Sequence, residues 1–172
     1  MIIRESKSRE LEAIYALHMA AFDADERELV AKLAIDLIKA AHPLLSLVAV
    51  SDDLVIGHIL FSPVSISNND NLSCFILAPL AVSPARQRQG VGSQLIEHGL
   101  RTLTAQGADV VFVLGDPDYY SRSGFHPVHD VSPSYSLPYP EAWQAKELRV
   151  GALQGVSGTV ECVSVLMSPE LW

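Results

Sequence analysis

Apolar residues recur along this chain with two different periods, and each period predicts a different kind of element. Spacings of three and four residues predict helices at about 8–22, 25–42 and 91–106, and a short helical turn follows around 117–123. Apolar runs bounded by polar or glycine-containing turns predict strands at 2–4, 45–50, 54–67, 73–82, 110–114, 146–150 and 158–167. The proline-rich stretch 127–140 is expected to be a loop.

The links between these elements predict how the strands pair. The polar links 51–53 and 68–71 are short, so the strands that they join are expected to form antiparallel hairpins. The succession of strand 73–82, helix 91–106 and strand 110–114 predicts one parallel pair. Pro79 lacks an N–H donor and marks a bulge or a locally unpaired stretch. We therefore expect a single α/β domain over residues 1–172, with a mostly antiparallel mixed sheet flanked by helices.

Composition and charge narrow the classes of function. Of the 172 residues, 49% are hydrophobic and 19% are charged, which suits a folded domain with a sizeable core. The formal net charge of −8 argues against nucleic-acid binding, which needs a basic face. An acidic surface suits a cationic substrate, although most acidic proteins are acidic only for solubility. The chain has no apolar run of membrane-spanning length and no secretory signal, so we expect a cytoplasmic protein with no membrane partner.

The cysteines and histidines show no pattern of a metal site. Cys74 and Cys162 lie far apart in apolar runs and are expected to be buried, reduced thiols. His126 and His129 lie in the proline-rich stretch with only Asp130 nearby, which is not a ligand set for a metal. The sequence therefore predicts no metal ion.

The segment 77–95 carries the clearest sign of chemistry. It is predicted to run from a strand through a tight loop that contains Gly90 and Gly92 into a helix. Glycines let a ligand approach the backbone, and the first turn of a helix offers unpaired N–H groups to an anion. Arg86 and Arg88 add positive charge beside this turn. The pattern favours a pyrophosphate site, although a glycine-rich turn without function has the same residues.

Two familiar nucleotide-binding motifs do not fit this segment. No Gly-Lys-Ser/Thr is present, which excludes a P-loop. The dinucleotide fingerprint needs a third Gly or Ala, and Leu95 stands at that position. It also needs an acid at the end of the next strand, whereas Asp109 precedes that strand.

Two motifs in order resemble the GNAT superfamily of N-acetyltransferases. The first is a Gln/Arg-x-x-Gly-x-Gly/Ala signature, which stands as Gln87-Arg88-Gln89-Gly90-Val91-Gly92. The second is a Tyr-x-x-x-Gly-Phe element at residues 120–125. The stretches 113–125, 151–153 and 158–160 are similar to a bacterial subgroup, the YhbS-like acetyltransferases. The resemblance implies a GNAT fold with one splayed parallel strand pair, and transfer of an acetyl group from acetyl-CoA to an amine by direct attack.

The resemblance also implies where acetyl-CoA binds. Its pantetheine arm is expected beside the strand residues Leu80, Ala81 and Val82, in the opening between the two parallel strands. The pyrophosphate is expected on the loop and first helical turn, with Tyr119 near the cofactor. The loop and helix residues are Gln87, Arg88, Gln89, Gly90, Val91, Gly92 and Ser93.

Tyr120 matches the tyrosine that serves as general acid in this family, with Tyr119 as the adjacent alternative. A phenol has an ordinary pKa near 10 and is protonated at neutral pH, so it can donate a proton to the leaving thiolate. A second interpretation is that Tyr120 only packs beside the cofactor.

The general base has several candidates. Many family members place a glutamate on the strand before the loop, but residues 73–82 contain no acid. The candidates are Glu26 and Asp116, a chain of water molecules, or an amine that binds already neutral. Asp116 has a second interpretation as a cap of the short helix.

The acceptor is an unidentified amine of a small molecule or a protein. Tyr135, Tyr139 and Trp143 are candidates for the walls of its pocket, or for packing of a long loop. Two other classes stay open: a non-catalytic acyl-CoA-binding module, for which the missing strand glutamate argues, and a nucleotide-binding α/β domain. The oligomeric state is expected to be a monomer or a homodimer.

Overall fold

The computed structural model describes residues 1–40 and 42–172, which form two compact units. The first unit comprises Met1–Phe61 and Ala78–Gly99, and the second comprises Ser62–Leu77 and Leu100–Trp172. The strands are β1 (Ile2–Glu5), β2 (Leu45–Ser51), β3 (Leu54–Ile66), β4 (Asn69–Val82), β5 (Val110–Leu114), β6 (Asp130–Ser132), β7 (Trp143–Glu147) and β8 (Ser157–Cys162). The α-helices are α1 (Leu11–Ala21), α2 (Arg27–Lys39), α3 (Val91–Ala105) and α4 (Pro117–Tyr120).

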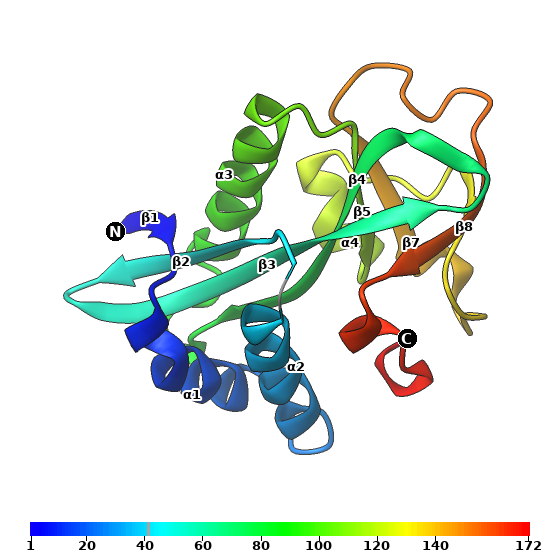
Figure 1. Cartoon of the computed structure of the whole chain (residues 1–172). Helices are drawn as coiled ribbons and strands as arrows, with labels where there is room; N and C mark the ends of the chain where they lie inside the picture. Colours follow the sequence, from blue (N-terminus) through cyan, green and yellow to red (C-terminus); the bar gives the residue numbers. More distant parts are fainter. Residues whose placement is uncertain (41) are drawn as a thin grey trace. The chain divides into compact units, whose positions relative to one another are not determined.

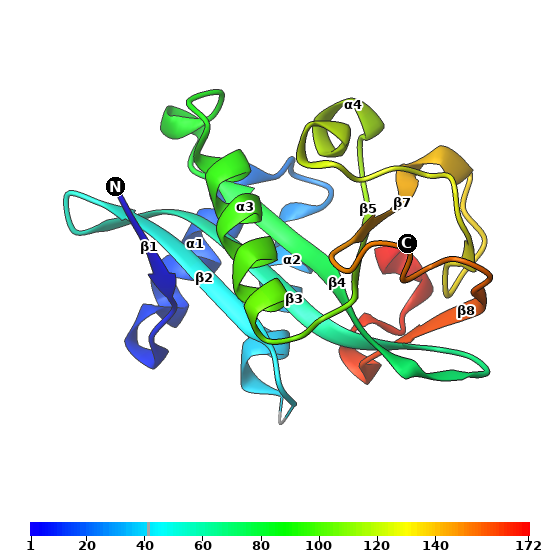
Figure 2. The ribbon, with the colours of Figure 1, turned by 90° about the horizontal axis from the view of Figure 1, so that it is seen from above.

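The first unit is a sheet with helices on both faces (Figures 1 and 2). β1 pairs antiparallel with β2, and β2 pairs antiparallel with β3. Successive residues of β3 point to opposite faces. At Gly57 a Cβ atom would lie 2.8 Å from Cδ1 of Leu95 on α3, whereas the His58 ring hydrogen-bonds to His18 on α1. The helix pair α1–α2 therefore covers one face of this sheet, and the start of α3 covers the other.

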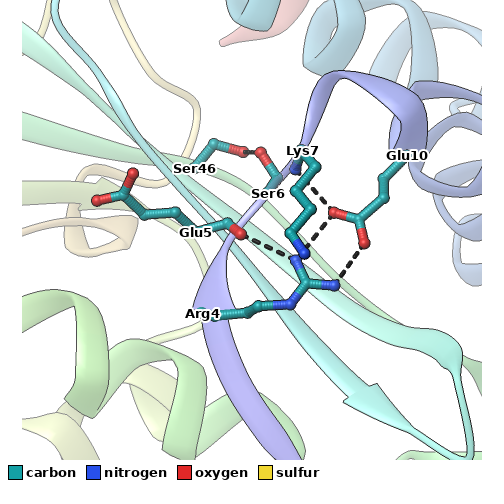
Figure 3. A network of polar contacts seen from close by, with 6 residues as sticks. All are labelled: Arg4, Glu5, Ser6, Lys7, Glu10 and Ser46. Atoms are coloured by element: carbon teal, nitrogen blue, oxygen red, sulfur yellow. Dashed lines mark hydrogen bonds and ion pairs between the residues drawn. The ribbon is translucent and has the colours of Figure 1, made fainter.

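Ion pairing fixes the link between β1 and α1 (Figure 3). The Arg4 guanidinium donates to both carboxylate oxygens of Glu10, with N–O distances of 2.6 and 3.1 Å. The same carboxylate accepts the Lys7 backbone N–H at 2.8 Å. The Arg4 hydrogen bond, more than any other contact, lowers the pKa of Glu10 below its ordinary value. The bidentate geometry holds the end of β1 against the η1 turn (Ser8–Glu10) that opens α1.

A chain of hydrogen bonds in the first unit connects the residue after β1 to β2, β3 and α1. The hydroxyls of Ser6 and Ser46 lie 2.7 Å apart, and Ser46 Oγ lies 3.0 Å from Nε2 of His58. Nδ1 of His58 lies 2.9 Å from Nε2 of His18. Both imidazole rings are fully buried. Burial lowers the pKa of His18 to about 4 and that of His58 well below its ordinary value, so both rings are neutral at pH 7.

The second unit holds the parallel pair. β4 and β5 run parallel from Cys74–Val110 to Leu77–Val113, and β7 pairs antiparallel with the other edge of β5. The end of β3 pairs antiparallel with β8, which pairs parallel with β6. The Phe112 and Trp143 rings stack at 5.2 Å with their planes 2° apart, at the centre of an aromatic core.

The predicted fold class is confirmed, with corrections to the elements. Hydrogen-bonded neighbours follow the order β1-β2-β3-β4-β5-β7, and the pairing is mostly antiparallel with the expected β4–β5 parallel pair. A second parallel pair, β6–β8, was not predicted, because β6 lies inside the stretch expected to be a loop. β4 begins at Asn69, within the predicted turn, because polar residues at an exposed hairpin end still pair. β7 begins three residues earlier than predicted, and β8 ends at Cys162 before a 3-10 turn (Ser164–Leu166). The single domain over 1–172 stays a prediction.

Candidate active site

Two side chains hold the loop between β4 and α3 in the first unit. Nε2 of Gln87 donates to the Val82 carbonyl at 3.2 Å, and Nε2 of Gln89 donates to the Ala85 carbonyl at 3.1 Å. The backbone N–H of Ser83 donates to the Ile56 carbonyl at 2.9 Å and anchors the end of β4 to β3. Both glutamines of the predicted signature thus act on the backbone of the loop itself.

The backbone of this loop turns through two left-handed residues before α3 begins. Arg88 has φ +58° and Gly90 has φ +83°, and only glycine adopts such a conformation without strain. The first helical hydrogen bond runs from Gln94 N to the Gly90 carbonyl at 3.0 Å. The N–H groups of Val91, Gly92 and Ser93 therefore have no carbonyl partner within the helix. Residues 87–90 and Ser93 are exposed, whereas Val91 and Gly92 are buried. This turn, at the positive end of a 15-residue helix, suits an anion.

The preceding strand supplies the predicted pantetheine-binding residues. The parallel ladder of β4 with β5 covers Cys74 to Leu77 and ends there. Pro79 follows, so this position offers no N–H to any ladder. Beyond it Leu80 and Val82 are half-buried and Ala81 is buried.

In the second unit, α4 begins at a proline directly after β5. Oδ1 of Asp116 accepts the backbone N–H of Asp118 at 2.9 Å, which is an N-cap bond. The Asp116 carbonyl accepts the Tyr120 N–H at 3.0 Å. Gly124, with φ +84°, ends the turn as the sequence predicted. Asp116 therefore has a structural role, which was one of its two interpretations.

The Tyr120 ring packs against two other aromatic rings within the second unit. It meets the Tyr119 ring at 5.0 Å and the Phe125 ring at 5.8 Å, both edge to face. A Cβ atom at Gly115 would collide with the Tyr120 ring, so this position must be glycine for the ring to fit. Burial raises the pKa of Tyr120 well above its ordinary value, and the neighbouring Tyr119 and Asp116 add to this effect. The phenol therefore keeps its proton at neutral pH.

The predicted site residues are distributed over the two units. The loop, the first turn of α3 and residues 80–82 lie in the first unit. Glu26 also lies there, exposed at the residue that precedes α2. Asp116, Tyr119 and Tyr120 are together in the second unit, where the Arg122 guanidinium lies 5.2 Å from the centre of the Tyr119 ring.

Sequence reasoning did not identify two residues that contact the glycines on either side of Tyr120. Nε2 of the fully buried Gln144 donates to the Gly115 carbonyl at 3.2 Å and fixes the backbone against which the Tyr120 ring packs. The Lys146 side chain lies against Gly124, where a Cβ atom would meet it. Both belong to β7, whose start the apolar pattern placed too late. The available signal was the alternation of polar with apolar residues, with Gln144 between Trp143 and Ala145.

Asp109, which precedes β5 and so does not fit the dinucleotide motif, binds groups of the protein itself. Oδ2 of Asp109 accepts the Ser73 backbone N–H at 2.8 Å, and Oδ1 accepts Nε of Arg149 at 2.8 Å. These bonds lower the pKa of Asp109 and tie the residue before β5 to β4 and to the residues that follow β7. Its carboxylate serves the fold.

The second unit also contains a pocket of about 780 Å³. It is lined by residues of the segment 127–137 together with Pro140 and Trp143. Tyr135 and Trp143 are among its walls, as the sequence suggested for an acceptor pocket. Tyr139 is 68% exposed and is not among the residues that line this pocket.

The described residues form neither a metal-binding cluster nor a membrane-spanning helix. Within 1–40 and 42–172, no three His, Cys, Asp or Glu side chains gather in a way that would hold a metal ion. Over the same residues, no helix combines the length and the apolar character needed to cross a membrane.

The strand order, the glycine bend before α3 and the tyrosine turn after β5 define a class of acetyltransferase. The chain belongs to the GNAT family, because the model of the Acetyltransferase (GNAT) domain matches residues 2–128.

Two relatives from Escherichia coli K12 agree with this assignment. The uncharacterized N-acetyltransferase YhbS is 39% identical over 165 residues, which cover 94% of this chain and 95% of YhbS. The uncharacterized N-acetyltransferase YjhQ is 43% identical over 116 residues. That match covers 67% of this chain and only 62% of YjhQ.

Solved structures give the same result. The crystal structure of E. coli YhbS in complex with CoA covers 96% of this chain and 91% of its own, at 36% identity and a TM-score of 0.88. A GNAT acetyltransferase from Brucella melitensis in complex with acetyl-CoA covers 96% of this chain and 97% of its own, at 29% identity and a TM-score of 0.76.

Proposed function

We propose that this protein transfers the acetyl group of acetyl-CoA to a primary amine, by direct attack of the amine on the thioester. The observation that carries the proposal is the bend at Gly90 before α3, whose first turn offers backbone N–H groups to a pyrophosphate in a chain of this family. CoA and acetyl-CoA in the structures of the two relatives support it.

In this proposal, the pyrophosphate binds the backbone N–H groups from Arg88 to Ser93. The pantetheine arm lies along Leu80, Ala81 and Val82, and Tyr119 lies beside the cofactor. The Leu80 N–H stabilises the oxyanion that forms when the amine adds to the carbonyl. Binding both reactants side by side removes most of the entropic barrier of a reaction between two molecules.

The proposed reaction replaces a carbon–sulfur bond with a carbon–nitrogen bond. A neutral amine nitrogen forms a bond to the thioester carbon, and the carbon–sulfur bond breaks. The CoA thiolate that leaves takes the proton of the Tyr120 phenol, and the new amide nitrogen releases a proton. The raised pKa of Tyr120 keeps the phenol protonated at the working pH, and it also makes the phenol a weaker acid than an ordinary tyrosine. The phenolate then regains a proton from water.

The base that neutralises the incoming ammonium is Glu26, Asp116 or water. Asp116 uses one carboxylate oxygen as a helix cap and retains the other for a water molecule. Glu26 is exposed. These observations favour proton loss to water, with Asp116 orienting it, over a buried carboxylate base.

The test is an amine screen with acetyl-CoA, read by the release of free CoA thiol. The expected result is thiol release that depends on one class of amine, with the N-acetyl product seen by mass spectrometry. Binding of acetyl-CoA without acetylation of any amine would favour a non-catalytic acyl-CoA-binding module instead. Displacement of acetyl-CoA by ATP or NAD at similar concentrations would favour a nucleotide-binding domain. The proposal includes a cytoplasmic location and a monomer or homodimer, which size-exclusion chromatography distinguishes.

The pyrophosphate site has a matched pair of variants. Gly90→Glu places a carboxylate at the proposed site, and Gly107→Glu makes the same change at φ +86°, where a Cβ atom would meet nothing within 4 Å. Both variants have the same backbone strain, of about 1 kcal/mol. We expect calorimetry to detect no CoA binding to Gly90→Glu and near parental affinity for Gly107→Glu. Equal affinity of Gly90→Glu and the parent would contradict the site.

A further inference from the structure

Two side chains of β7 hold the two ends of the turn that carries Tyr120. Before the turn, Nε2 of Gln144 donates to the Gly115 carbonyl at 3.2 Å. After the turn, a Cβ atom at Gly124 would meet the Cδ, Cε and Nζ atoms of Lys146, so this side chain lies across the bare glycine. Gln144 and Lys146 are two residues apart in one strand and therefore point to the same face of the sheet. One face of β7 thus supports the turn on both sides of Tyr120.

Packing alone does not explain a glutamine at position 144. Glutamine side chains are mostly exposed in proteins, whereas Gln144 is fully buried and pairs with the buried Val113 of β5. The amide nitrogen must face Gly115, because the Gly115 carbonyl can only accept a hydrogen bond. The amide oxygen Oε1 then has no hydrogen-bond partner among the residues that the structure describes. Since an unpaired buried acceptor lowers stability, an apolar residue of the same size would suit the core better.

The hydrogen bond from Gln144 completes the support of one peptide group. The Gly115 N–H donates to the Ala142 carbonyl at 2.9 Å, and the Gly115 carbonyl accepts Nε2 of Gln144. Both polar groups of Gly115 are therefore bonded to the chain segment 142–144. This residue follows directly after β5, so its position is fixed relative to the strand pair.

Tyr120 depends on this part of the backbone in two ways. A Cβ atom at Gly115 would collide with Cε2 of the Tyr120 ring and would lie 3.5 Å from Cζ, which carries the hydroxyl. The ring therefore packs directly on the main chain at residue 115. In addition, the Tyr120 N–H donates to the carbonyl of the next residue, Asp116, at 3.0 Å. A shift of Gly115 would thus move both the ring and the backbone of Tyr120.

The proposed role of Tyr120 is sensitive to such a shift. A general acid transfers its proton only within hydrogen-bond reach, at about 2.6–3.2 Å between the heavy atoms. A displacement of about 1 Å can lower the rate about 10²-fold. The residue that holds Gly115 is therefore able to control proton donation without touching the reactants.

We propose that Gln144 is a positioning residue for the general acid Tyr120. Its carboxamide fixes the Gly115 peptide, and this peptide sets the position of the phenol. All of these residues belong to the second unit. The inference rests on the proposed function of Tyr120 and adds the residue through which β7 controls it.

The kinetic test uses Gln144→Met, which removes the hydrogen bond to Gly115 and keeps most of the side-chain volume. With the amine found in the thiol-release screen, we expect kcat to fall by about tenfold or more because the phenol is misplaced. KM for acetyl-CoA should stay near the parental value, since residues 80–82 and 87–93 lie in the first unit. Gln144→Asn keeps a carboxamide that is one methylene too short to reach Gly115. It should show the same loss of kcat, and it provides a second measurement should Gln144→Met be unstable.

The control for a general loss of stability is Val110→Ala. Val110 is fully buried in β5 and pairs with Glu147, so its side chain lies on the face opposite to Gln144. This variant should unfold at a lower urea concentration than the parent and keep the parental kcat where it is folded. Parental kcat in both Gln144 variants, or an equal loss of kcat in Val110→Ala, would overturn the inference.

A double-mutant cycle with Tyr120→Phe separates positioning from an independent structural defect. If Gln144 acts through the phenol, Gln144→Met should not lower kcat further in the Tyr120→Phe background, because no phenol proton is left to position. The same fold-loss in both backgrounds would overturn the inference while acetyl transfer itself stood. Parental kcat in Tyr120→Phe, or failure of every amine in the screen, would instead count against the proposed function and, with it, the role of Gln144.

Discussion

At the scale of single residues, the environment of Tyr120 is the feature most directly linked to chemistry. Its ring is enclosed by Tyr119, Phe125 and the bare backbone of Gly115. The sequence motif predicted the tyrosine and Gly124, because a motif fixes residue identities at short range. It did not predict Gln144, which holds Gly115 from a strand that lies 29 residues further along the chain.

Tyr120→Phe removes the proposed proton donor and keeps the ring. We expect kcat to fall by about 10²-fold or more, the range of general acid catalysis, with little change in the affinity for CoA. Because burial raises the pKa of Tyr120, the parental kcat should also show no decline near pH 10, where an ordinary phenol ionises. Steady-state kinetics from pH 7 to 10.5 measure both effects.

Tyr139→Phe is the control, since Tyr139 is 68% exposed and does not line the pocket. A Tyr120→Phe variant with parental kcat would leave Tyr120 with a packing role only.

At the scale of elements, α3 lies close to β3 because two positions lack side chains. A Cβ atom at Gly57 would lie 2.8 Å from the Leu95 side chain, and a Cβ atom at Gly99 would collide with the Phe61 ring. Phe61 is fully buried, so its ring has no free space to move into.

Gly99→Ala therefore has two opposing effects on stability. Alanine favours a helix over glycine by about 1 kcal/mol, whereas overpacking a full core costs about 1–3 kcal/mol. We expect the collision with Phe61 to dominate and the free energy of unfolding to fall, as measured by urea denaturation. Ser93→Ala, at an exposed position of the same helix, should be nearly neutral. A stabilised Gly99→Ala variant would contradict the close packing of α3 on β3.

The histidine pair between α1 and β3 makes the stability of these elements depend on pH. Burial holds the pKa of His18 at about 4, so the folded protein does not protonate this ring between pH 6.5 and 4, whereas the unfolded chain does. The stability that the neutral ring provides is complete above pH 6.5 and is lost as the pH falls toward 4. For His18 alone the loss is about 3 kcal/mol.

Urea denaturation at pH 7.5, 6, 5 and 4 checks this expectation. His58→Gln should weaken the dependence on pH, because one titrating ring of the pair is removed. His126→Gln, which changes a histidine of the second unit, should keep the parental dependence. A parental protein whose free energy of unfolding is constant from pH 7.5 to 5 would contradict the buried, neutral pair.

The elements also show where a single sequence stops being informative. The long helices and the central strands were predicted because their apolar periods are regular over many residues. β6 is three residues long and pairs with β8, 27 residues away. No local sequence pattern therefore predicts it. The pocket wall depends on the same segment, and only its aromatic residues could be singled out in advance.

At the scale of the whole molecule, both cysteines are expected to be unreactive in the folded protein. Cys74 and Cys162 are buried, and burial raises the pKa of the first thiol to about 12 and that of the second to about 11. Since only the thiolate reacts, an aromatic disulfide reagent should detect almost no protein thiol in native protein at pH 8. In urea it should detect both cysteines of each chain. Rapid labelling of the native protein would contradict this burial, and it would also add background to the CoA thiol assay.

The path of the chain through its two units has a consequence for dissection. The chain leaves one unit for the other after Phe61, returns after Leu77 and leaves again after Gly99. No single cut can therefore release either unit intact. A fragment that stops where the family model stops, at residue 128, would lose β6, β7 and β8 and expose the hydrogen-bonding edge of β5. The last quarter of the sequence is thus not a removable tail. It is part of the sheet, and without it β5 would be an unpaired edge strand that can pair with other chains and aggregate.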